Sequence, residues 1–295
     1  MKNTIFTGAA TAIVTPMTKD GIDYAQFARL IEWQIAQGID AIVAVGTTGE
    51  GPTLNDEEHR EAIRFCVEQV AGRVPVIAGT GSNDTAYAVD LTRFACEVGA
   101  DAMLLVTPYY NKATQAGLVQ SFTAVADAST KPCILYNVPS RTGCNLQPQT
   151  VAKLAEHPRI AAIKEASGDI SQVAKIAALC RDKLDIYSGN DDQIVPILSL
   201  GGKGVISVLS NVMPRQTVEM CRRFFQGDAA GAAQLQLQLL PLIDALFCEV
   251  NPIPVKAAMA AMGYGENYLR LPLTPMEPAH EQELLRLMRE QGVID

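Results

Sequence analysis

Eight short apolar segments recur between Thr7 and about Asn211, and stretches with helical periodicity separate them. This alternation indicates successive βα units that build a parallel sheet. Eight such units are the number that closes a barrel. The segments read AATAIVTP, AIVAVGTTG, VPVIAGTG, AMLLVTPYY, CILYNVPS, IAAIKEAS, LDIYSGND and GVISVLSN. We therefore expect an α/β fold, a (β/α)8 TIM barrel.

The stretches between these segments have the pattern of amphipathic helices. Their apolar residues recur three and four positions apart, which gives each stretch one face for packing on the sheet. Asn55 and Glu58 have the spacing of a capping box at the start of the second helix. Gly99 is typical of a helix end and predicts where the third helix stops.

The strand pattern stops after Asn211, and the rest of the chain has helical patterns only. No linker rich in Gly, Ser or charge separates this part from the barrel, so we expect the two to pack together. We predict that residues 1–225 form the (β/α)8 barrel. Residues 226–295 should form a C-terminal helical extension packed on it.

Charge and composition restrict the kinds of partner. The 295 residues carry a formal net charge of −8, and the Lys and Arg residues form no basic run. This argues against nucleic acid and anionic membranes as partners and favours a small molecule. No apolar run reaches the roughly 18 residues of a membrane-spanning helix, and the N-terminal stretch makes a poor signal peptide. Seven scattered cysteines without a C-x-x-C pair favour a reducing compartment, so we expect a cytoplasmic protein.

The histidines give no sign of a metal site. Only His59, His157 and His280 occur, and none has a second histidine at H-x-H or H-x-x-x-H spacing. We therefore expect no bound metal and reject a metal-dependent aldolase.

Polar side chains collect where the expected strands end. In a parallel barrel these ends, and the βα loops that follow them, converge on one face of the molecule. Hydroxyls, one arginine and one lysine should therefore point at the same end of the barrel. The strand ends read GTTGE (46–50), TPYYN (107–111), YNVPSR (136–141), KEAS (164–167) and SGND (188–191).

Lys164 interrupts the apolar run AAIKEASG, which otherwise looks like a buried strand. A buried ammonium must be paired, reach a surface or lose its proton. One alternative is an ion pair with a carboxylate such as Glu165 or Glu50. However, Glu165 is adjacent and should face the opposite side of the strand. A desolvated lysine that loses its proton suits Schiff-base chemistry with a carbonyl substrate, which is the interpretation we favour.

Four other residues at the strand ends could serve such chemistry. Tyr136 ends the preceding strand and could exchange a proton with Lys164, although a core tyrosine with a satisfied hydroxyl is equally ordinary. Thr47 and Thr48 lie between two glycines and could hold a carboxylate, whereas a plain turn is the alternative. Arg141 could grip a carboxylate with two parallel hydrogen bonds, or be a solvated loop charge.

The loop after the fourth expected strand carries Tyr109 and Tyr110 directly behind a proline. Two exposed aromatic side chains in a loop fit a subunit contact as well as an active-site role. The glycines of SLGGKGVISV are better explained by a tight turn than by a phosphate site, because the segment lacks further donors.

Five of these motifs, in this order, resemble the family of pyruvate-dependent class I aldolases and lyases that includes the dihydrodipicolinate synthases and the N-acetylneuraminate lyases. The resemblance covers nearly the whole chain. Its marks are VGTTGE (45–50), TPYYNK (107–112), YNVPSRTG (136–143), IKEASGD (163–169) and YSGND (187–191).

Within the family, the resemblance is greatest to the branch that condenses pyruvate with L-aspartate 4-semialdehyde to 4-hydroxy-tetrahydrodipicolinate, on the diaminopimelate route to lysine. Arg141 matches the arginine that grips the carboxylate of the semialdehyde. Thr48, as the second threonine of GTTGE, differs from the serine-threonine pair expected in the sialic-acid lyase branch.

The resemblance implies a role for each of these residues. Lys164 would attack the keto carbon of pyruvate, and Tyr136 would shuttle protons as the carbinolamine becomes an imine and then an enamine. Thr47 and Tyr110 would complete the proton relay, with Tyr110 entering from a neighbouring subunit. The residues that would contact the pyruvate carboxylate or the bound intermediate are Thr48, Gly189 and Ile206. No cofactor is implied, because the protonated imine is itself the electron sink.

The resemblance also implies a homotetramer, a pair of tight dimers, and raises the question of feedback by lysine. A regulatory pocket at the dimer interface would keep His59, Asn83 and Tyr109. At the positions of a histidine and a glutamate of lysine-inhibited members, the chain has Asp56 and Tyr87. Without that glutamate a bound lysine ammonium would lack a partner, so we expect weak or absent feedback.

Two other functions remain open from the sequence. The first is a related pyruvate-dependent aldolase that acts on a sugar acid. Arg141 is the residue that distinguishes the synthase from this aldolase. The second is a barrel without catalytic activity that binds a ligand; such a protein would be expected to lose the lysine or the tyrosine, and this chain keeps both Lys164 and Tyr136.

Overall fold

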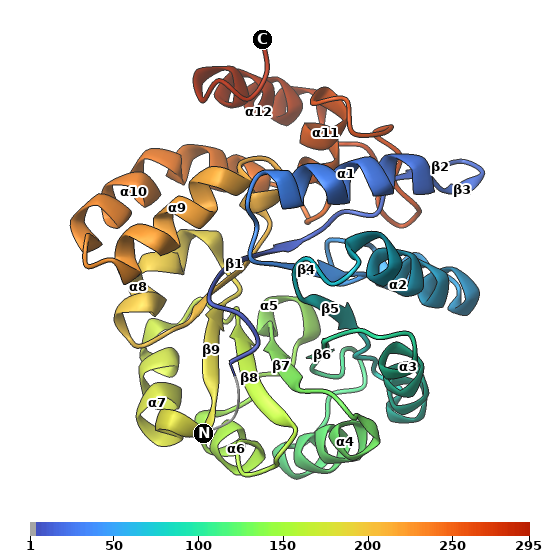
Figure 1. The fold of residues 1–295 in the computed structure, drawn as a ribbon, viewed down its shortest axis with the longest axis vertical. Coiled ribbons are helices and arrows are strands. Elements are labelled where there is room, and N and C mark those ends of the chain that lie inside the picture. Colours follow the sequence, from blue (N-terminus) through green and yellow to red (C-terminus); the bar gives the residue numbers. More distant parts are fainter. Residues whose placement is uncertain (1–3) are drawn as a thin grey trace.

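The computed structural model describes residues 4–295. Eight parallel strands close into a barrel in the order β1-β10-β9-β8-β7-β6-β5-β4, with helices around it (Figure 1). The predicted TIM barrel is confirmed. The strands are β1 (Gly8–Ala12), β4 (Ala41–Ala44), β5 (Val76–Gly79), β6 (Ala102–Val106), β7 (Cys133–Asn137), β8 (Ile160–Glu165), β9 (Asp185–Ser188) and β10 (Gly204–Ser207).

Helices connect the strands and cover the outside of the barrel. The helices that follow barrel strands are α1 (Tyr24–Ala36), α2 (Asp56–Val70), α3 (Thr85–Glu97), α4 (Gln115–Ala128), α5 (Pro139–Thr142), α6 (Pro148–Leu154), α7 (Ile170–Cys180), α8 (Ile194–Ser199) and α9 (Pro214–Phe225). Single 3-10 turns also occur, namely η1 (Gly51–Thr53), η2 (Arg181–Lys183), η3 (Asp191–Gln193) and η4 (Leu209–Asn211). One antiparallel pair, β2 (Met17–Thr18) with β3 (Gly21–Ile22), was not expected from the sequence, because two-residue strands leave no periodic pattern.

The helix ends follow the capping residues in the sequence. The Asn55 side chain accepts from the Glu58 N–H, and the Glu58 carboxylate accepts from the Asn55 N–H, so the predicted capping box opens α2. Gly99 lies just beyond the end of α3 with a φ of +94°, a conformation that favours glycine. Both predictions are confirmed.

The apolar core has two layers. One layer includes side chains from all the long helices and fills the space between helices and barrel. The other contains no residue of these helices and fills the inside of the barrel. Near the amino end of the barrel, the Phe6 ring stacks on Tyr187 with 4.3 Å between ring centres, and the Tyr187 hydroxyl donates to the Phe6 carbonyl at 2.7 Å. These residues fill the interior at that end, so access from solvent lies at the other.

Three helices form the C-terminal extension: α10 (Ala229–Leu246), α11 (Ile253–Ala261) and α12 (Pro278–Glu290). The α10 helix packs on α9 and α12, and α11 packs on α12 and contacts η4, the turn that follows β10. In Figure 1 the extension lies next to α1 and α9. The expected helical extension is therefore present, and its division from the barrel at residue 225 stays a prediction.

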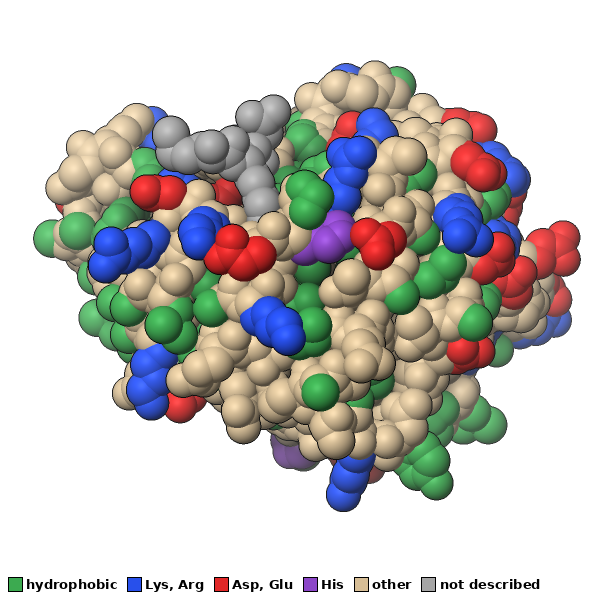
Figure 2. Space-filling view, turned by 90° about the horizontal axis from the view of Figure 1, so that it is seen from below, with side chains coloured by type: hydrophobic (Ala, Val, Ile, Leu, Met, Phe, Trp, Pro, Cys, Tyr) green, Lys and Arg blue, Asp and Glu red, His purple; other side chains and the backbone are tan. Residues whose placement is uncertain are grey.

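The surface has mixed charge. On the face seen in Figure 2, Lys and Arg side chains are interspersed with Asp and Glu rather than gathered in one basic patch. In the part of the chain that the structure describes, no helix is both long enough and apolar enough to span a membrane.

Candidate active site

Lys164 points into the barrel and is almost completely buried, with 5% of its surface exposed. It lies on β8 between Ala162 and Ala166, which both belong to the inner layer of the core, so alternation along the strand directs its side chain inward. The register pairs Lys164 with Tyr136 on β7. The Lys164 Nζ lies 4.3 Å from the centre of the Tyr136 ring, so the structure brings the predicted amine and phenol together.

The alternative in which Lys164 pairs with Glu165 or Glu50 is wrong. Within residues 4–295 no ion pair includes Lys164; Glu50 is bound by Lys256 instead, at 2.5 Å. Glu165 faces away from the barrel interior, where its carboxylate accepts from the Ser167 N–H at 2.7 Å and from the Asn137 amide at 3.1 and 3.2 Å. Burial raises the pKa of the Glu165 carboxyl. The amine therefore lies in a nearly dry site without the usual partner of an ammonium.

Gly189 lies directly against the Lys164 side chain. A Cβ on Gly189 would lie 2.7 Å from the Ala166 Cβ and 3.1 Å from both Cε and Cγ of Lys164. A side chain at this position would therefore push the amine aside. Ile206, on β10, belongs to the same inner layer of the core as Tyr136.

Asp191, just after Gly189 in the chain, is a fully buried carboxyl that the sequence reasoning did not single out. Its Oδ2 accepts the N–H groups of Val208 and Leu209 at 2.9 Å, which fixes the end of β10. Its Oδ1 has no hydrogen-bond partner in the described part of the chain. Burial raises the pKa of Asp191, while hydrogen bonds from Ser207 and from the Leu209 and Val208 N–H groups act in the opposite direction.

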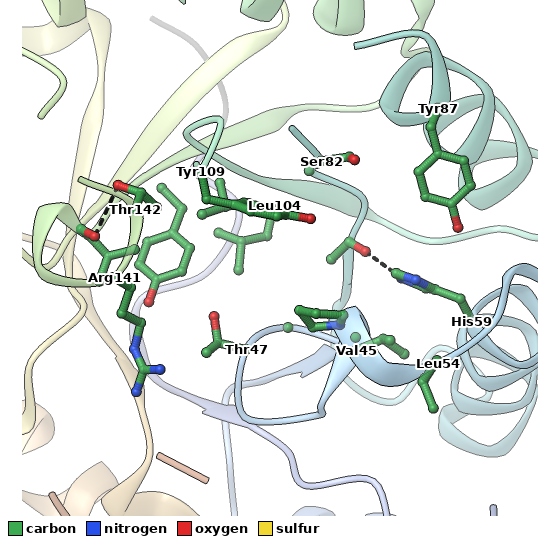
Figure 3. Close-up of a pocket in the computed structure, with 18 of the residues that line it drawn as sticks. Val45, Thr47, Leu54, His59, Ser82, Tyr87, Leu104, Tyr109, Arg141 and Thr142 are labelled. Atoms are coloured by element: carbon green, nitrogen blue, oxygen red, sulfur yellow. Dashed lines mark hydrogen bonds between the residues drawn. The ribbon is translucent and has the colours of Figure 1, made fainter. Parts of the chain in front are cut away.

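A cavity of about 590 Å³ opens at the carboxyl ends of the strands. Thr47 and Arg141 lie at one end of it (Figure 3), and Tyr136 is also among its lining residues. His59 and Tyr87 line the other end, with Leu104 and Val45 between. Three of the predicted reaction and substrate residues, Thr47, Tyr136 and Arg141, thus share one continuous cavity with His59, whereas Lys164 lies beside Tyr136 and is not among the lining residues.

The loop of residues 46–50 carries both threonines. Thr47 is half-buried and lines the cavity, whereas Thr48 is buried and its hydroxyl accepts from the Asn251 amide at 3.1 Å. Behind the loop, Gly79 permits a close approach, because a Cβ there would lie 2.4 Å from the Val45 carbonyl oxygen. The backbone at the start of the loop is therefore packed tightly on β5.

Arg141 lies on the short helix α5, and its guanidinium reaches the cavity. It is exposed, and within residues 4–295 no carboxylate pairs with it. Thr142 behind it is buried, where its hydroxyl donates to the Val138 and Cys144 carbonyls. A free guanidinium on a fixed turn can receive a carboxylate group of a ligand.

The two tyrosines of the TPYYN motif have different environments, which corrects the expectation that both are exposed. Tyr109 is half-buried and lines the cavity, whereas Tyr110 is 91% exposed with a φ of +73°. The Asn83 amide donates to the Tyr109 carbonyl at 3.2 Å, and the Asn111 amide donates to the Asn83 carbonyl at 2.8 Å. These bonds fix the turn that projects Tyr110 away from its own chain.

The far end of the cavity holds three of the residues considered for regulation. His59 is buried, and its Nε2 lies 2.9 Å from the Gly79 carbonyl oxygen, which requires an N–H at that nitrogen. Burial lowers the pKa of His59. The Arg60 Nε–H donates to both carboxylate oxygens of Asp56 at 2.9 Å, and the Tyr87 hydroxyl donates to the same carboxylate. The bond from Arg60 lowers the pKa of Asp56.

Possible metal ligands do not gather in the described structure: no three His, Cys, Asp or Glu side chains of residues 4–295 are arranged to hold an ion. At the end of the cavity that holds Thr47 and Arg141, the groups offered to a substrate are hydroxyl and guanidinium groups, with the Lys164 amine next to Tyr136.

The comparison with known proteins identifies the family. The model of the dihydrodipicolinate synthetase family matches residues 5–291. The chain belongs to this family. The resemblance seen in the sequence motifs is thus confirmed, and so is the expectation of an enzyme of this kind.

Members of the family resemble the chain over its full length. A 4-hydroxy-tetrahydrodipicolinate synthase of Lachnoclostridium phytofermentans is 56% identical, over 98% of this chain and 99% of that protein. The solved dihydrodipicolinate synthase of Thermotoga maritima is 41% identical with a TM-score of 0.97, covering 99% of this chain and 100% of that one. The synthase of Acinetobacter baumannii, solved with pyruvate, is 45% identical with a TM-score of 0.96 over 99% and 100% of the two chains.

Sequence reasoning missed the residues that support the site from the C-terminal extension, namely Asn251, Lys256 and Arg270. One signal could have found Lys256. It interrupts the apolar segment PVKAAMAAMG in the same way as Lys164 interrupts its strand. No pattern in the sequence indicated that it would meet Glu50.

Proposed function

We propose that this protein condenses pyruvate with L-aspartate 4-semialdehyde to 4-hydroxy-tetrahydrodipicolinate in lysine biosynthesis. The observation that carries the proposal is the buried Lys164 amine, which lies beside Tyr136 and is free of any carboxylate partner in the described structure. The names of the proteins that the chain resembles support the same reaction.

The reaction begins at Lys164. Its amine attacks the keto carbon of pyruvate, and the carbinolamine loses water to give an imine. Loss of a proton from the methyl carbon gives the enamine, whose carbon attacks the aldehyde, and the aldehyde oxygen takes up a proton to become the hydroxyl. The amino group of the semialdehyde then replaces the Lys164 amine at the former keto carbon, which closes the ring and frees the lysine. Tyr136 shuttles the protons of these steps, with Thr47 as the next member of the relay. The burial of the Lys164 side chain protects the imine, because it limits the access of water that would hydrolyse it.

The two carboxylates of the substrates bind at different places. The loop of residues 46–50, with Thr48 in it, holds the carboxylate of pyruvate together with Gly189, which lies against Lys164, and Ile206 of the inner core layer. Arg141 holds the carboxylate of the semialdehyde at the mouth of the cavity, where its guanidinium is unpaired in the described part of the chain.

The working molecule is a cytoplasmic homotetramer, a dimer of dimers, in which Tyr110 completes the relay of a neighbouring subunit. The exposure of Tyr110, 91%, on a turn that is itself fixed supports a contact outside its own chain. All seven cysteines are free, which fits a reducing compartment.

Replacement of Arg141 tests the choice of the second substrate. The unmodified protein should turn over pyruvate with the semialdehyde, and Arg141→Ala should lower kcat/KM for the semialdehyde by at least tenfold while pyruvate still labels Lys164. Equal or better turnover of a sugar acid by the unmodified protein would contradict the proposal. The similar proteins of Lachnoclostridium phytofermentans and Thermotoga maritima are synthases, which disfavours that sibling activity.

A further inference from the structure

The C-terminal extension contacts the loop of residues 46–50 through a buried ion pair. The Lys256 Nζ on α11 donates to the Glu50 Oε1 at 2.5 Å, and the side chains of the two residues are 2% and 0% exposed. Close by, the Asn251 amide donates to the Thr48 hydroxyl at 3.1 Å. Two residues of a five-residue loop are thus held by the segment that joins α10 to α11 and by α11 itself.

A second segment of the extension binds the same carboxylate. The Arg270 N–H donates to the Glu50 Oε2 at 3.3 Å, so both oxygens of Glu50 have partners. The Arg270 guanidinium binds Glu58 with both of its terminal nitrogens, at 2.5 and 2.6 Å, and the Thr53 carbonyl at 3.0 Å. Polar contacts therefore run from the extension, through the loop, to the first turn of α2.

The backbone of the loop needs such support. Val45 comes just before the loop and Glu50 is its last residue. Their φ values are +54° and +55°, in the left-handed region that residues other than glycine rarely adopt. For Val45, a β-branched residue, this conformation is an outlier. Such conformations persist only where the surroundings fix them, and they gather at functional sites. The hydrogen bonds from Lys256 and Arg270 to Glu50 hold the last residue of the loop in this conformation.

We propose that Glu50 and Lys256 are positioning residues for the pyruvate subsite. This inference rests on the proposed function, and it assigns to the extension a part in substrate binding. Neither residue lines the cavity, so neither touches the substrate; they act by holding Thr47 at the cavity and Thr48 behind it. An ion pair without solvent fixes one geometry, because both charges would be left unpaired if the loop moved.

Three variants separate positioning from stability. Lys256→Met leaves a buried carboxylate unpaired, Glu50→Gln keeps the shape of the side chain and one acceptor, and the double variant leaves no unpaired charge. The probe is pyruvate with borohydride, and the readout is the pyruvate concentration that gives half-maximal labelling of Lys164. Leu284→Ala, in the buried face of α12, lowers the melting temperature without touching the loop and serves as the control.

We expect half-maximal labelling to require at least tenfold more pyruvate in Lys256→Met and severalfold more in Glu50→Gln, with the KM for the semialdehyde changed less than twofold. The double variant should regain most of the lost melting temperature but keep the weakened pyruvate binding. Leu284→Ala should melt earlier with unchanged labelling.

If folded Glu50→Gln and the folded double variant both label at the pyruvate concentration of the unmodified protein, the positioning role is wrong. Equal weakening in Leu284→Ala would also overturn it, because stability alone would then explain the effect. If pyruvate does not label the unmodified protein at all, the proposed function fails, and the positioning role fails with it.

Discussion

The amine of Lys164 lies 4.3 Å from the centre of the Tyr136 ring, and the two residues are paired in register on neighbouring strands of the barrel. Both side chains are almost completely buried and point into the interior. The contact places the phenol beside the amine, where it can exchange protons with a carbonyl adduct formed on that amine. The packing around the pair makes several predictions.

Gly189→Ala should displace the amine. The new methyl group would lie 2.7 Å from the Ala166 Cβ and 3.1 Å from two carbons of Lys164. Such overpacking costs about 1–3 kcal/mol of stability, and we expect labelling by pyruvate and kcat to fall by at least tenfold. Thermal melts and borohydride labelling measure the two effects.

Gly117→Ala, on α4 outside the barrel, is the matched control, because a Cβ there meets only ordinary contacts. It should leave the activity unchanged and should stabilise the helix by about 0.5–1 kcal/mol. A fully active Gly189→Ala variant would show that Lys164 does not need its observed position.

Mixing two inactive variants tests whether Tyr110 acts across a subunit interface. Tyr110→Phe lacks the hydroxyl that we expect a neighbour to receive, and Lys164→Ala lacks the amine. A subunit that carries Tyr110→Phe keeps Lys164 and can borrow an intact Tyr110 from a Lys164→Ala subunit. Refolding the two together should therefore restore activity that neither has alone. Mass measurement shows whether the hybrids have formed. If they form and no activity is recovered, Tyr110 lies outside the relay.

Feedback by lysine should be weak or absent. Both oxygens of Asp56 are bound by Arg60, and Tyr87 donates its hydroxyl to the same carboxylate, so no free carboxylate of the described residues lines that end of the cavity to receive the ammonium of lysine. Initial rates with added lysine measure this directly. Half-inhibition at submillimolar lysine would contradict the prediction.

The buried His59 should make the protein less stable in mild acid. Burial lowers the pKa of His59 in the folded state, whereas in the unfolded chain it has its ordinary value of about 6.5. Below that pH the unfolded state binds the proton more readily, so folding loses about 1.4 kcal/mol for each unit by which the pKa is lowered. The loss of stability begins as the pH falls through about 6.5 and grows until the pH reaches the folded pKa. Below that pH it stays constant, and above about 6.5 it is absent.

Melting temperatures of the unmodified protein and His59→Gln, measured from pH 7.5 downward, check this effect. The glutamine amide can still donate to the Gly79 carbonyl but does not titrate, so His59→Gln should lose less stability on acidification. Leu284→Ala should melt earlier by a similar amount at every pH. Parallel pH curves for the unmodified protein and His59→Gln would contradict the prediction.

The sequence could predict the barrel because its signals are local. Each strand is a short apolar run, each helix has one apolar face, and the Asn55 and Glu58 capping box needs only four residues to form. Lys164 and Tyr136 could be placed together because alternation along a strand fixes the direction of a side chain, and consecutive strands of a barrel are neighbours.

The support of the site could not be predicted, because it depends on residues distant in sequence. Glu50 meets Lys256 across 206 positions, and Thr48 meets Asn251 across 203. The assignment of Glu50 as a possible partner of Lys164 failed for this reason: Glu50 pairs with a different buried lysine, Lys256, which only the packing of α11 brings to it. The environment of Tyr109 likewise depended on Asn83 in another loop.

Trapping the covalent intermediate tests the role of Lys164 most directly. The intact protein is incubated with pyruvate, reduced with borohydride, digested and mapped by mass spectrometry. We predict one reduced pyruvyl adduct per chain, on Lys164, and none in Lys164→Ala. An unlabelled protein, or an adduct on another lysine such as Lys256 with Lys164 unmodified, would contradict this role.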